Sequence, residues 1–441
     1  MGGPAGWIKH AVFCFVAICP LGYVALTGAS DENAARRPVG PDRYLGSFRV
    51  PRDDGSGRPA DPPRFQYSFG GNLAAADGQT FWLSTHERHR FVGKIAIPTP
   101  ARPSSPTAFQ ELPVAKALAP AIDITEGLRA PDVQGTDRSM ILSDAIVEGS
   151  QLRWVFHDYY NVSQKRYRVF GVFHSETGTS DGPFGLIDAV REPIRDQVSG
   201  RYLTAIPGNW ATRLQASMAS GGGGLAGQKA WGAGPSLYAF SPPERDADPH
   251  TTFLEAKPLL LYPFDDEQPV PARRALENWN RACRPYDAVW IGDTVVFAVC
   301  WGRGAIWYGE AEGPDGQIDW HVKDKGYHAA WYELQLLFYR AGDLMDVAQG
   351  KAPTWKPRPF AAVTIPHLMG AVRGAAQVSP ISLSWDPGAE RLYVVQGLAD
   401  RSRSEYDRHP VVHVYDLRGM ESPADWIAAL QRSSAREKQT P

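Results

Sequence analysis

The sequence predicts an all-β fold, a five-bladed β-propeller whose last blade is closed by an N-terminal strand. The chain holds 43 Gly and 37 Pro, which mark many turns, and 14 Trp, 17 Tyr and 18 Phe, which suit the half-buried faces of strands. One layout, an apolar strand followed by a tight turn and a second apolar strand, recurs along the chain. No long amphipathic helix interrupts it. These observations favour many short strands arranged by radial repetition.

The first thirty residues read as an export signal. Lys9 and His10 form a basic flank, the apolar run Ala11–Leu26 follows, and small residues end the segment at Ser30. The run is shorter than the roughly 20 apolar residues that a spanning helix needs, so a cleaved signal is favoured over a permanent anchor. We therefore expect a secreted or periplasmic protein with no membrane span after cleavage. The expected organisation is signal peptide 1–30, linker 31–43, propeller 44–420, and a short helix with a tail, 421–441.

The repeats define the expected blades. The clearest hairpin turns at Asp77-Gly78, a pair typical of a type I′ turn, and others turn at Glu148-Gly149, Gly292-Asp293 and Asp386-Pro387-Gly388. The second strands of four units also align with one another, which a pair of β-sandwich domains would not explain. The five expected units cover residues 73–97, 140–174, 214–262, 288–308 and 381–417, and the expected long loops are 102–120, 221–234, 245–255 and 313–330.

Two terminal elements complete the expected fold. The lone strand Tyr44–Val50 precedes the first unit and is placed to close the last blade, because propellers leave no open sheet edge. Residues 423–431 are expected to form a short helix. The mature chain would keep only Cys283 and Cys300, which could form a disulfide across one strand or remain buried thiols.

Several segments resemble a family of uncharacterised secreted bacterial proteins. The stretches that carry the resemblance include Phe69-Gly-Gly-Asn-Leu-Ala, Tyr202-Leu-Thr-Ala-Ile-Pro-Gly-Asn-Trp210, Lys325-Gly-Tyr-His328 and Trp385-Asp-Pro387. They run from about residue 44 to residue 417. Thr85-His86-Glu87 and Glu333 depart from the family pattern. The resemblance implies a single exported repeat domain and brings no known activity.

Charge and motifs exclude several function classes. The 46 basic and 48 acidic residues are spread evenly, with no basic stripe of the kind that binds nucleic acid. The chain has no Gly-x-Ser-x-Gly elbow, no P-loop, no His-Glu-x-x-His and no Cys-x-x-Cys. The Gly-rich segment 221–227 lacks a surrounding βαβ unit, so we interpret it as a flexible loop.

Three carboxyl residues are the candidate catalytic groups: Glu126, Asp144 and Asp287. Glu126 precedes the first strand of the second unit, Asp144 lies inside that strand, and Asp287 begins the first strand of the fourth unit. Carboxylates that converge on a propeller axis would suit a glycoside hydrolase, which needs one general acid and one base or nucleophile. The structural alternative is that Asp144 and Asp287 cap turns or pair with arginine.

Histidines and aromatic residues at strand ends are the candidate ligand-binding groups. Strand-end histidines in a ring would face one pocket, and exposed aromatic rings would stack on the C–H faces of sugars; the alternative is ordinary packing between blades. Two or three histidines with a carboxylate could also hold a divalent metal, but no pair has the spacing of a recognised site, so no metal ligand or cofactor is assigned. The candidates are His86, His157, Tyr159, Tyr202, Trp210, Trp301, Arg303, Lys325 and His328.

Two functions remain open from the sequence. One is an exported carbohydrate-active hydrolase that acts on an extracellular or cell-envelope glycan. The other is a non-catalytic propeller that binds a glycan or a protein, and a monomer is expected in either case. The fold alone cannot decide between them, since propellers host both.

Overall fold

The computed structural model describes residues 42–57, 74–86, 89–125, 140–158, 168–226, 229–263, 272–310, 312–314, 316, 326–370, 380–402, 408–420 and 422–437. The chain divides into two compact units, Met1–Pro38 and Val39–Pro441, and every described residue belongs to the second. The expected signal peptide, most of the linker, Glu126, Tyr159 and Lys325 lie outside the described residues.

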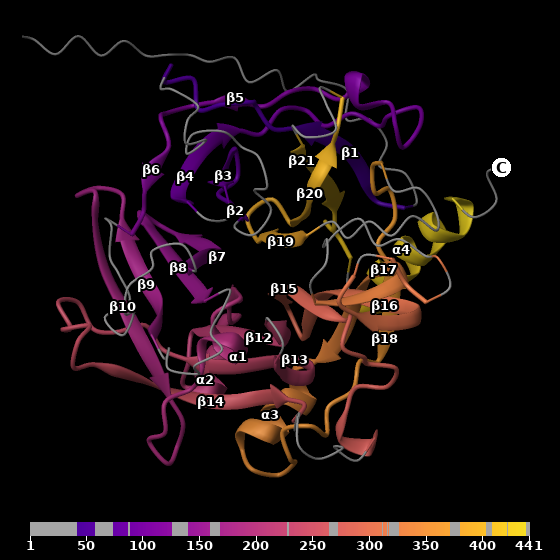
Figure 1. Ribbon diagram of the computed structural model, residues 1–441. Coiled ribbons are helices and arrows are strands. Elements are labelled where there is room, and N and C mark those ends of the chain that lie inside the picture. The colour runs from indigo at the N-terminus through magenta and orange to yellow at the C-terminus, as the bar shows by residue number, and fades with distance from the viewer. Residues whose placement is uncertain are drawn as a thin grey trace, which may run out of the picture. The chain divides into compact units, whose positions relative to one another are not determined.

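The described residues are mostly β-strand, which confirms the predicted all-β character (Figure 1). Their strands form antiparallel meanders that follow one another along the chain. Meander 1 contains β2 (Ala74–Ala76), β3 (Thr80–His86), β4 (His89–Ala96) and β5 (Lys116–Ala117), and β6 (Ile122–Asp123) also pairs with β4. Meander 2 contains β7 (Met140–Glu148), β8 (Gln151–Asp158), β9 (Arg168–His174) and β10 (Thr179–Ile187).

The later meanders repeat the pattern. Meander 3 contains β11 (Tyr202–Ala205), β12 (Met218–Ala226), β13 (Lys229–Phe240) and β14 (Phe253–Leu261). Meander 4 contains β15 (Arg284–Ile291), β16 (Thr294–Tyr308), β17 (Tyr327–Arg340) and β18 (Ala361–Thr364). Meander 5 contains β19 (Ile381–Asp386), β20 (Arg391–Asp400) and β21 (His409–Asp416), and β1 (Tyr44–Arg49) completes it.

The predicted closing strand is confirmed: β1 pairs antiparallel with β21, so the start of the described chain completes the last meander. A second cross-connection joins meanders 2 and 3, whose outer strands β10 and β14 pair in parallel and make one eight-stranded sheet. Both contacts cover strand edges that would otherwise expose unpaired backbone groups.

The first strands of the meanders lie next to one another around a common centre, and β2, β7, β15 and β19 surround it in Figure 1. Among the described residues, β2 contacts β7, β7 contacts β11, β11 contacts β15, β15 contacts β19, and β19 contacts β2. We call these five the inner strands and their common centre the axis.

The core lies in layers between neighbouring meanders. In β16, Val295 and Phe297 pack toward meander 3, whereas Val296 and Ala298 pack toward meander 5. Successive side chains of a strand point to opposite faces, so a strand buried on both faces needs a continuous apolar run. This explains the unbroken apolar sequence Val295–Trp301.

Short helices occupy the connections. The α-helices are α1 (Asp196–Ser199), α2 (Gly208–Leu214), α3 (Ala341–Ala348) and α4 (Pro423–Glu437), and the 3₁₀ turns are η1 (Phe109–Glu111) and η2 (Ala272–Arg274). Trp426 of α4 packs edge-on against Phe338 of β17, at 5.0 Å between ring centroids, which fixes the predicted C-terminal helix on meander 4. In the part of the chain that the structure describes, no helix is long and apolar enough to cross a membrane.

Several sequence expectations need correction. Residues 221–226 belong to β12 rather than to a flexible loop, and the inner strand of meander 3 is β11, not the segment that begins at Leu214. In the fourth expected unit, the segment Ala305–Tyr308 could be taken for a strand of its own, but it continues β16 past a bulge at Gly304. Of the two alternatives left open for Cys283 and Cys300, the structure has the buried thiols: no disulfide joins the two residues.

Candidate ligand site at the inner strands

Two of the three candidate catalytic carboxyl groups meet at the axis. Asp144 lies on β7 and Asp287 on β15, and each sits at a register shift of its strand. A bulge turns one side chain out of the regular alternation, and here it turns the carboxyl group toward the neighbouring inner strand. The two side chains hydrogen-bond to each other. We call them the axial pair; the third candidate, Glu126, lies outside the described residues.

Both members of the axial pair accept backbone N–H groups from two strands. Asp144 Oδ1 accepts from Ala145 N at 2.7 Å, and its Oδ2 accepts from Leu203 N of β11 at 2.6 Å. Asp287 Oδ1 accepts from Ala288 N and its Oδ2 from Leu383 N of β19, each at 2.6 Å. Each carboxyl group thus joins its own inner strand to the next one.

Burial governs the protonation of the axial pair. Asp144 and Asp287 are only 2% and 1% exposed. Burial raises the pKa of Asp287 to about 8, against the lowering effect of its two backbone N–H donors. Burial, and next the charge of Asp287, raise the pKa of Asp144 well above its usual range. At neutral pH the pair therefore holds a proton, as expected for two carboxyl groups in hydrogen-bonding contact.

Hydroxyl groups make the same connection at two further junctions, β11–β15 and β19–β2. Thr204 Oγ1 of β11 accepts from Trp290 N of β15 at 2.8 Å, and Ser384 Oγ of β19 accepts from Ala76 N of β2 at 3.0 Å. Aspartate and hydroxyl residues therefore alternate from one inner strand to the next. Because these contacts satisfy buried or partly buried backbone donors, these side chains hold the inner strands together.

The candidate ligand-binding residues separate into buried and partly exposed groups. His157 is 7% exposed and its Nδ1 lies 2.6 Å from Ser143 Oγ; burial, and then the charge of Arg201, lower its pKa well below the usual range. Tyr202 is fully buried, and its hydroxyl donates to the carbonyl oxygens of Gly222 and Ser236. Tyr202 thus packs inside meander 3.

Four further candidates lie away from the axial pair, in or beside meander 4. Trp210 of α2 is buried and donates from Nε1 to Asp293 Oδ1 at 2.8 Å. His328 is buried beneath Trp307, with its Nε2 3.1 Å from Gly309 O. Trp301 is buried against Trp279, and Arg303, partly buried, lies over the Trp301 ring and forms an ion pair with Glu333 at 3.0 Å. For His86 the structure gives its place in β3 alone.

Two histidines of the predicted group, His157 and His328, have different neighbours, and the side chain of His86 lies outside what the structure describes. His157 contacts Ser143 near the axis, whereas His328 contacts Gly309 and Trp307 on β16–β17. Among the described residues, no three His, Cys, Asp or Glu side chains are grouped closely enough to hold a metal ion.

The structure adds a basic cluster that the sequence analysis missed. Arg201 precedes β11 and Arg284 begins β15, so both guanidinium groups lie where adjacent inner strands start. Arg201 Nη2 donates to Gln197 Oε1 at 3.1 Å, and Arg284 hydrogen-bonds to Tyr286. Burial, and next the charge of Arg284, lower the pKa of Arg201 to about 10. We call Arg201 and Arg284 the arginine pair. In the sequence, the feature that could have indicated it is a charged residue directly before an apolar inner strand.

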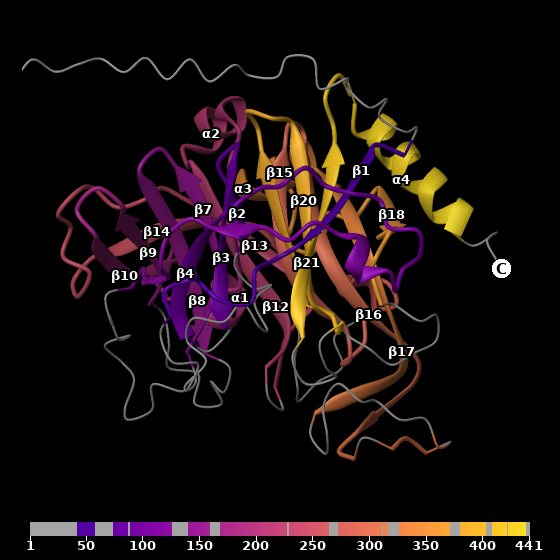
Figure 2. The same cartoon turned by 90° about the horizontal axis from the view of Figure 1, so that it is seen from above.

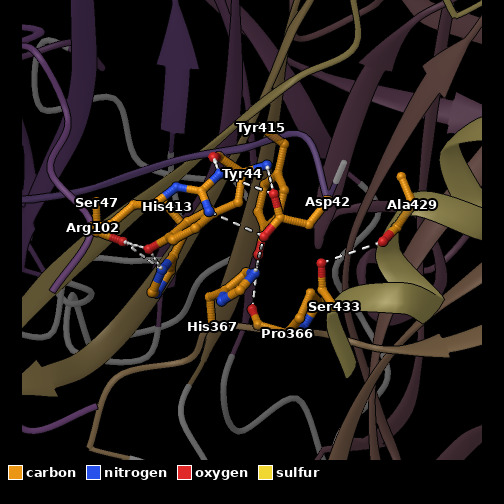
Figure 3. A network of polar contacts seen from close by, with 10 residues as sticks. All are labelled: Asp42, Tyr44, Ser47, Arg102, Pro366, His367, His413, Tyr415, Ala429 and Ser433. Carbon is orange, nitrogen blue, oxygen red and sulfur yellow. Dashed lines mark hydrogen bonds and ion pairs between the residues drawn. The ribbon is translucent and has the colours of Figure 1, made fainter. Parts of the chain in front are cut away.

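A second polar network fastens the closing strand (Figure 3). Asp42 accepts from Arg102 at 2.9 and 3.2 Å, and His367 Nε2 lies 3.5 Å from Asp42 Oδ2. The ring of Tyr44 stacks on His367 at 4.0 Å. Burial alone would raise the pKa of Asp42, but its hydrogen bonds to His367 and Arg102 outweigh burial and hold that pKa well below its usual range. We call Asp42, Tyr44, Arg102 and His367 the closing clasp.

Ser47 and His413 form a buried extension of that network. Ser47 Oγ lies 2.7 Å from His413 Nδ1, and His413 Nε2 lies 3.0 Å from Gln396 Oε1. The arrangement resembles a serine–histidine pair, but both residues are fully buried. The pair therefore joins β1, β20 and β21, and a nucleophilic role would require access that the fold does not give.

Comparison with protein-family models and with curated protein sequences gives no match. Among solved structures, the chain is similar to an arabinanase from Bacillus subtilis, with 10% identity, a TM-score of 0.40, and coverage of 85% of this chain and 96% of that one. A family 43 endo-arabinanase from Bacillus licheniformis matches at 10% identity and TM-score 0.36, covering 79% and 93%. A luciferin-regenerating enzyme matches at 12% identity and TM-score 0.30, covering 80% and 78%. At such scores the function has to be argued from the residues of this chain.

Proposed function

We propose that residues 44–420 form a five-bladed β-propeller that binds an acidic glycan where the inner strands begin. The propeller assignment is supported by the five consecutive meanders of the described chain, the contacts between neighbouring inner strands, and the closure of the last meander by β1. We further propose that residues 1–30 are a cleaved export signal, which mass spectrometry of the mature N-terminus would test.

The arginine pair is the observation that carries the proposed binding function. Arg201 and Arg284 lie close enough for the charge of one to lower the pKa of the other, although both are partly buried. The two like charges repel each other, the charge of Asp196 offsets part of that repulsion at Arg201, and a bound anion would offset it further. Arginine also presents a planar fork that suits carboxylate groups. A sugar acid such as a uronate combines the required charge with the polar ring that an exported glycan-binding protein would meet.

Binding can be tested with matched charged and neutral probes. We expect trigalacturonate to bind more tightly than its methyl ester, which has the same rings without the charge. Arg201→Gln and Arg284→Gln should each weaken binding of the acid about tenfold or more, since a charge-assisted hydrogen bond contributes about 1.5–3 kcal/mol. The same substitutions should leave binding of the ester nearly unchanged, and Arg191→Gln, at an arginine 77% exposed in its side chain, serves as the control. Equal affinity of the wild type for both probes would refute the proposal.

Glycan hydrolysis is the second candidate, and one observation favours it. With a pKa of about 8, Asp287 is a carboxylic acid at neutral pH, as a general acid has to be. Two features weigh against it: both members of the axial pair are almost fully buried, and all four carboxyl oxygens accept backbone N–H groups. Hydrolase carboxyl groups lie about 5–9.5 Å apart to leave room for substrate or water, whereas these two are hydrogen-bonded.

The hydrolase candidate has its own test. Purified protein would be screened for release of reducing sugar from plant and bacterial glycans, alongside Glu126→Gln and Asp287→Asn. Turnover that both substitutions abolish would establish hydrolysis by these residues. Absence of turnover, or equal turnover in wild type and variants, would reject it.

A further inference from the structure

The hairpin of β16 and β17 carries aromatic side chains beyond the core. Its first part is buried on both faces, but from Arg303 outward most of its residues are partly or fully exposed. Figure 2 shows this outer part extending away from the other sheets. We call residues 303–308 and 327–332 the aromatic arm; its rings are Trp307, Tyr308, Tyr327, Trp331 and Tyr332.

Two rings of the aromatic arm offer a large open surface. Tyr308 is 48% exposed and Trp331 is 42% exposed. Trp307 differs, because its ring stacks on His328 at 5.5 Å and its other contacts include Gly313, where an added Cβ would lie 3.1 Å from the ring. Trp307 therefore supports the arm, while Tyr308 and Trp331 are available to a ligand.

The open rings are held in place by their neighbours. Tyr308 meets Tyr327 edge to face at 5.0 Å, and Arg281 Nη1 donates to the Tyr327 hydroxyl at 2.6 Å. The indole of Trp331 borders Gly304, whose positive φ of +73° shapes the bulge beside it. A ring fixed before binding loses little conformational entropy when a ligand stacks on it.

The exposed area favours a small occupant. A large aromatic side chain has roughly 150–250 Å² of surface, so the two half-exposed rings together offer on the order of 200 Å². A stable protein partner needs about 800 Å² on each side. One or two sugar rings fit the smaller area, because a pyranose has a flat C–H face that stacks on an aromatic ring and hydroxyl groups at its edge for a neighbouring arginine.

The aromatic arm is connected to the arginine pair by a short stretch of chain. Arg281, which contacts Tyr327 on the arm, precedes Arg284 by three residues. In the strand register Arg284 pairs with Cys300, whereas Trp331 pairs with Arg303, three residues further along β16, and Tyr308 lies eight residues beyond Cys300. At about 3.3 Å per residue these steps span about 10 and about 26 Å, which correspond to roughly two and five sugar units. A chain of about six sugars is therefore long enough to reach both places.

We propose that Tyr308 and Trp331 form an extension subsite, on which sugar rings of a glycan chain stack while an acidic unit of the same chain occupies the arginine pair. This inference rests on the proposed glycan-binding function. It makes the preferred ligand a chain of about six sugars.

The test compares probe length in calorimetric titrations of the full chain. Hexagalacturonate should bind the wild type at least tenfold more tightly than digalacturonate. Trp331→Ala and Tyr308→Ala should each remove most of that gain and leave digalacturonate binding unchanged, while Trp331→Phe, which keeps a ring, should retain it. Thermal unfolding of the variants should match the wild type because both side chains are about half exposed.

The outcomes separate this inference from the proposed function. If the Ala variants bind hexagalacturonate as the wild type does, or lose digalacturonate binding equally, the extension subsite is refuted. The methyl ester of hexagalacturonate supplies the second arm of the test. A length-dependent gain for the ester that Trp331→Ala removes would support the subsite even if the acidic preference fails.

Discussion

Asp287 of the axial pair and Asp42 of the closing clasp are both buried carboxyl groups, but they differ in what neutralises them. Asp42 faces the guanidinium of Arg102 and the ring of His367, and its pKa is lowered. Asp287 faces Asp144 and two backbone N–H groups, and its pKa is raised to about 8. A cationic partner keeps a buried carboxylate charged, whereas dipoles and a second carboxyl group leave burial as the stronger effect. The two regions therefore connect strands by opposite electrostatics.

The largest expected effect is at the axis. Asp144→Ala removes the acceptor of two buried N–H groups, those of Ala145 and Leu203, and the partner of Asp287. We expect a loss of about 3–5 kcal/mol in the free energy of unfolding, because each unsatisfied buried group costs about 1–3 kcal/mol. Urea unfolding followed by tryptophan fluorescence measures it. Asp346→Ala, at an exposed position of α3, is the control and should stay within about 0.5 kcal/mol. An unchanged midpoint in Asp144→Ala would show that the axial pair does not hold the strands.

The clasp should respond less than the axis. Arg102→Ala deprives Asp42 of two hydrogen bonds, but the arginine side chain is 45% exposed, so water can replace part of the interaction. We expect a loss of about 1–3 kcal/mol. Hydrogen exchange should also increase in β1 and β21 before it increases elsewhere. Uniform exchange across all sheets would contradict the assignment of the clasp to ring closure.

The pH dependence should distinguish the two regions by sign. A raised folded pKa means that the stability due to Asp287 is fully present below its unfolded pKa of about 4. It is lost as the pH rises toward about 8, by about 1.4 kcal/mol per pH unit at most. A lowered folded pKa means that the stability due to Asp42 is present above about pH 4 and is lost as the pH falls below it. Urea midpoints between pH 2.5 and 9, a range set by these values, should therefore fall at both ends. Asp287→Asn should lessen the fall on the alkaline side alone, where Asp144 still titrates, and Asp42→Asn should lessen the fall on the acidic side alone; the opposite assignment would overturn the comparison.

The smallest effect is expected at the hydroxyl contacts. Thr204→Val and Ser384→Ala each remove one acceptor from a backbone N–H group and leave a similar volume behind. Each should lower the free energy of unfolding by about 1 kcal/mol. Thr212→Val, at an exposed hydroxyl of α2 that bonds within its own helix, is the matched control. A loss as large as that of Asp144→Ala would mean that accepting a second backbone N–H group adds nothing to the stability that Asp144 provides.

The sequence predicts the strands better than the connections. The turns at Gly149 and Gly292 were predictable because each glycine stands between two apolar runs. Both glycines adopt the positive φ that such turns require. The closing strand was predictable because a ring requires it. The glycines of β12 were taken for a loop, but Gly221 and Gly222 lie in a strand. Glycine is needed there because an added Cβ atom would lie within 2.3 Å of the backbone of Ser236 or Gln197. Such close approach is invisible in a single sequence.

The candidate site was predictable only in part. Asp144 and Asp287 stood out as charged residues inside apolar strands, and their meeting at the axis follows from equivalent positions in the ring. Their roles were not predictable, since the N–H groups of Leu203 and Leu383 come from other strands. Arg201 and Arg284 were missed because no local pattern brings together two arginines 83 positions apart.

Asp287 and Arg284 lie on the same inner strand. Substituting each of them tests most directly whether the axial pair stabilises the fold while the arginine pair binds the ligand. Trigalacturonate binding and urea unfolding would be measured on the same preparations of Arg284→Gln and Asp287→Asn. We predict that Arg284→Gln loses binding about tenfold or more, by the loss of one charge-assisted hydrogen bond, with little change in stability. Asp287→Asn should lose stability and keep its binding constant. Binding lost in Asp287→Asn and kept in Arg284→Gln would contradict the account and place the ligand at the axial pair.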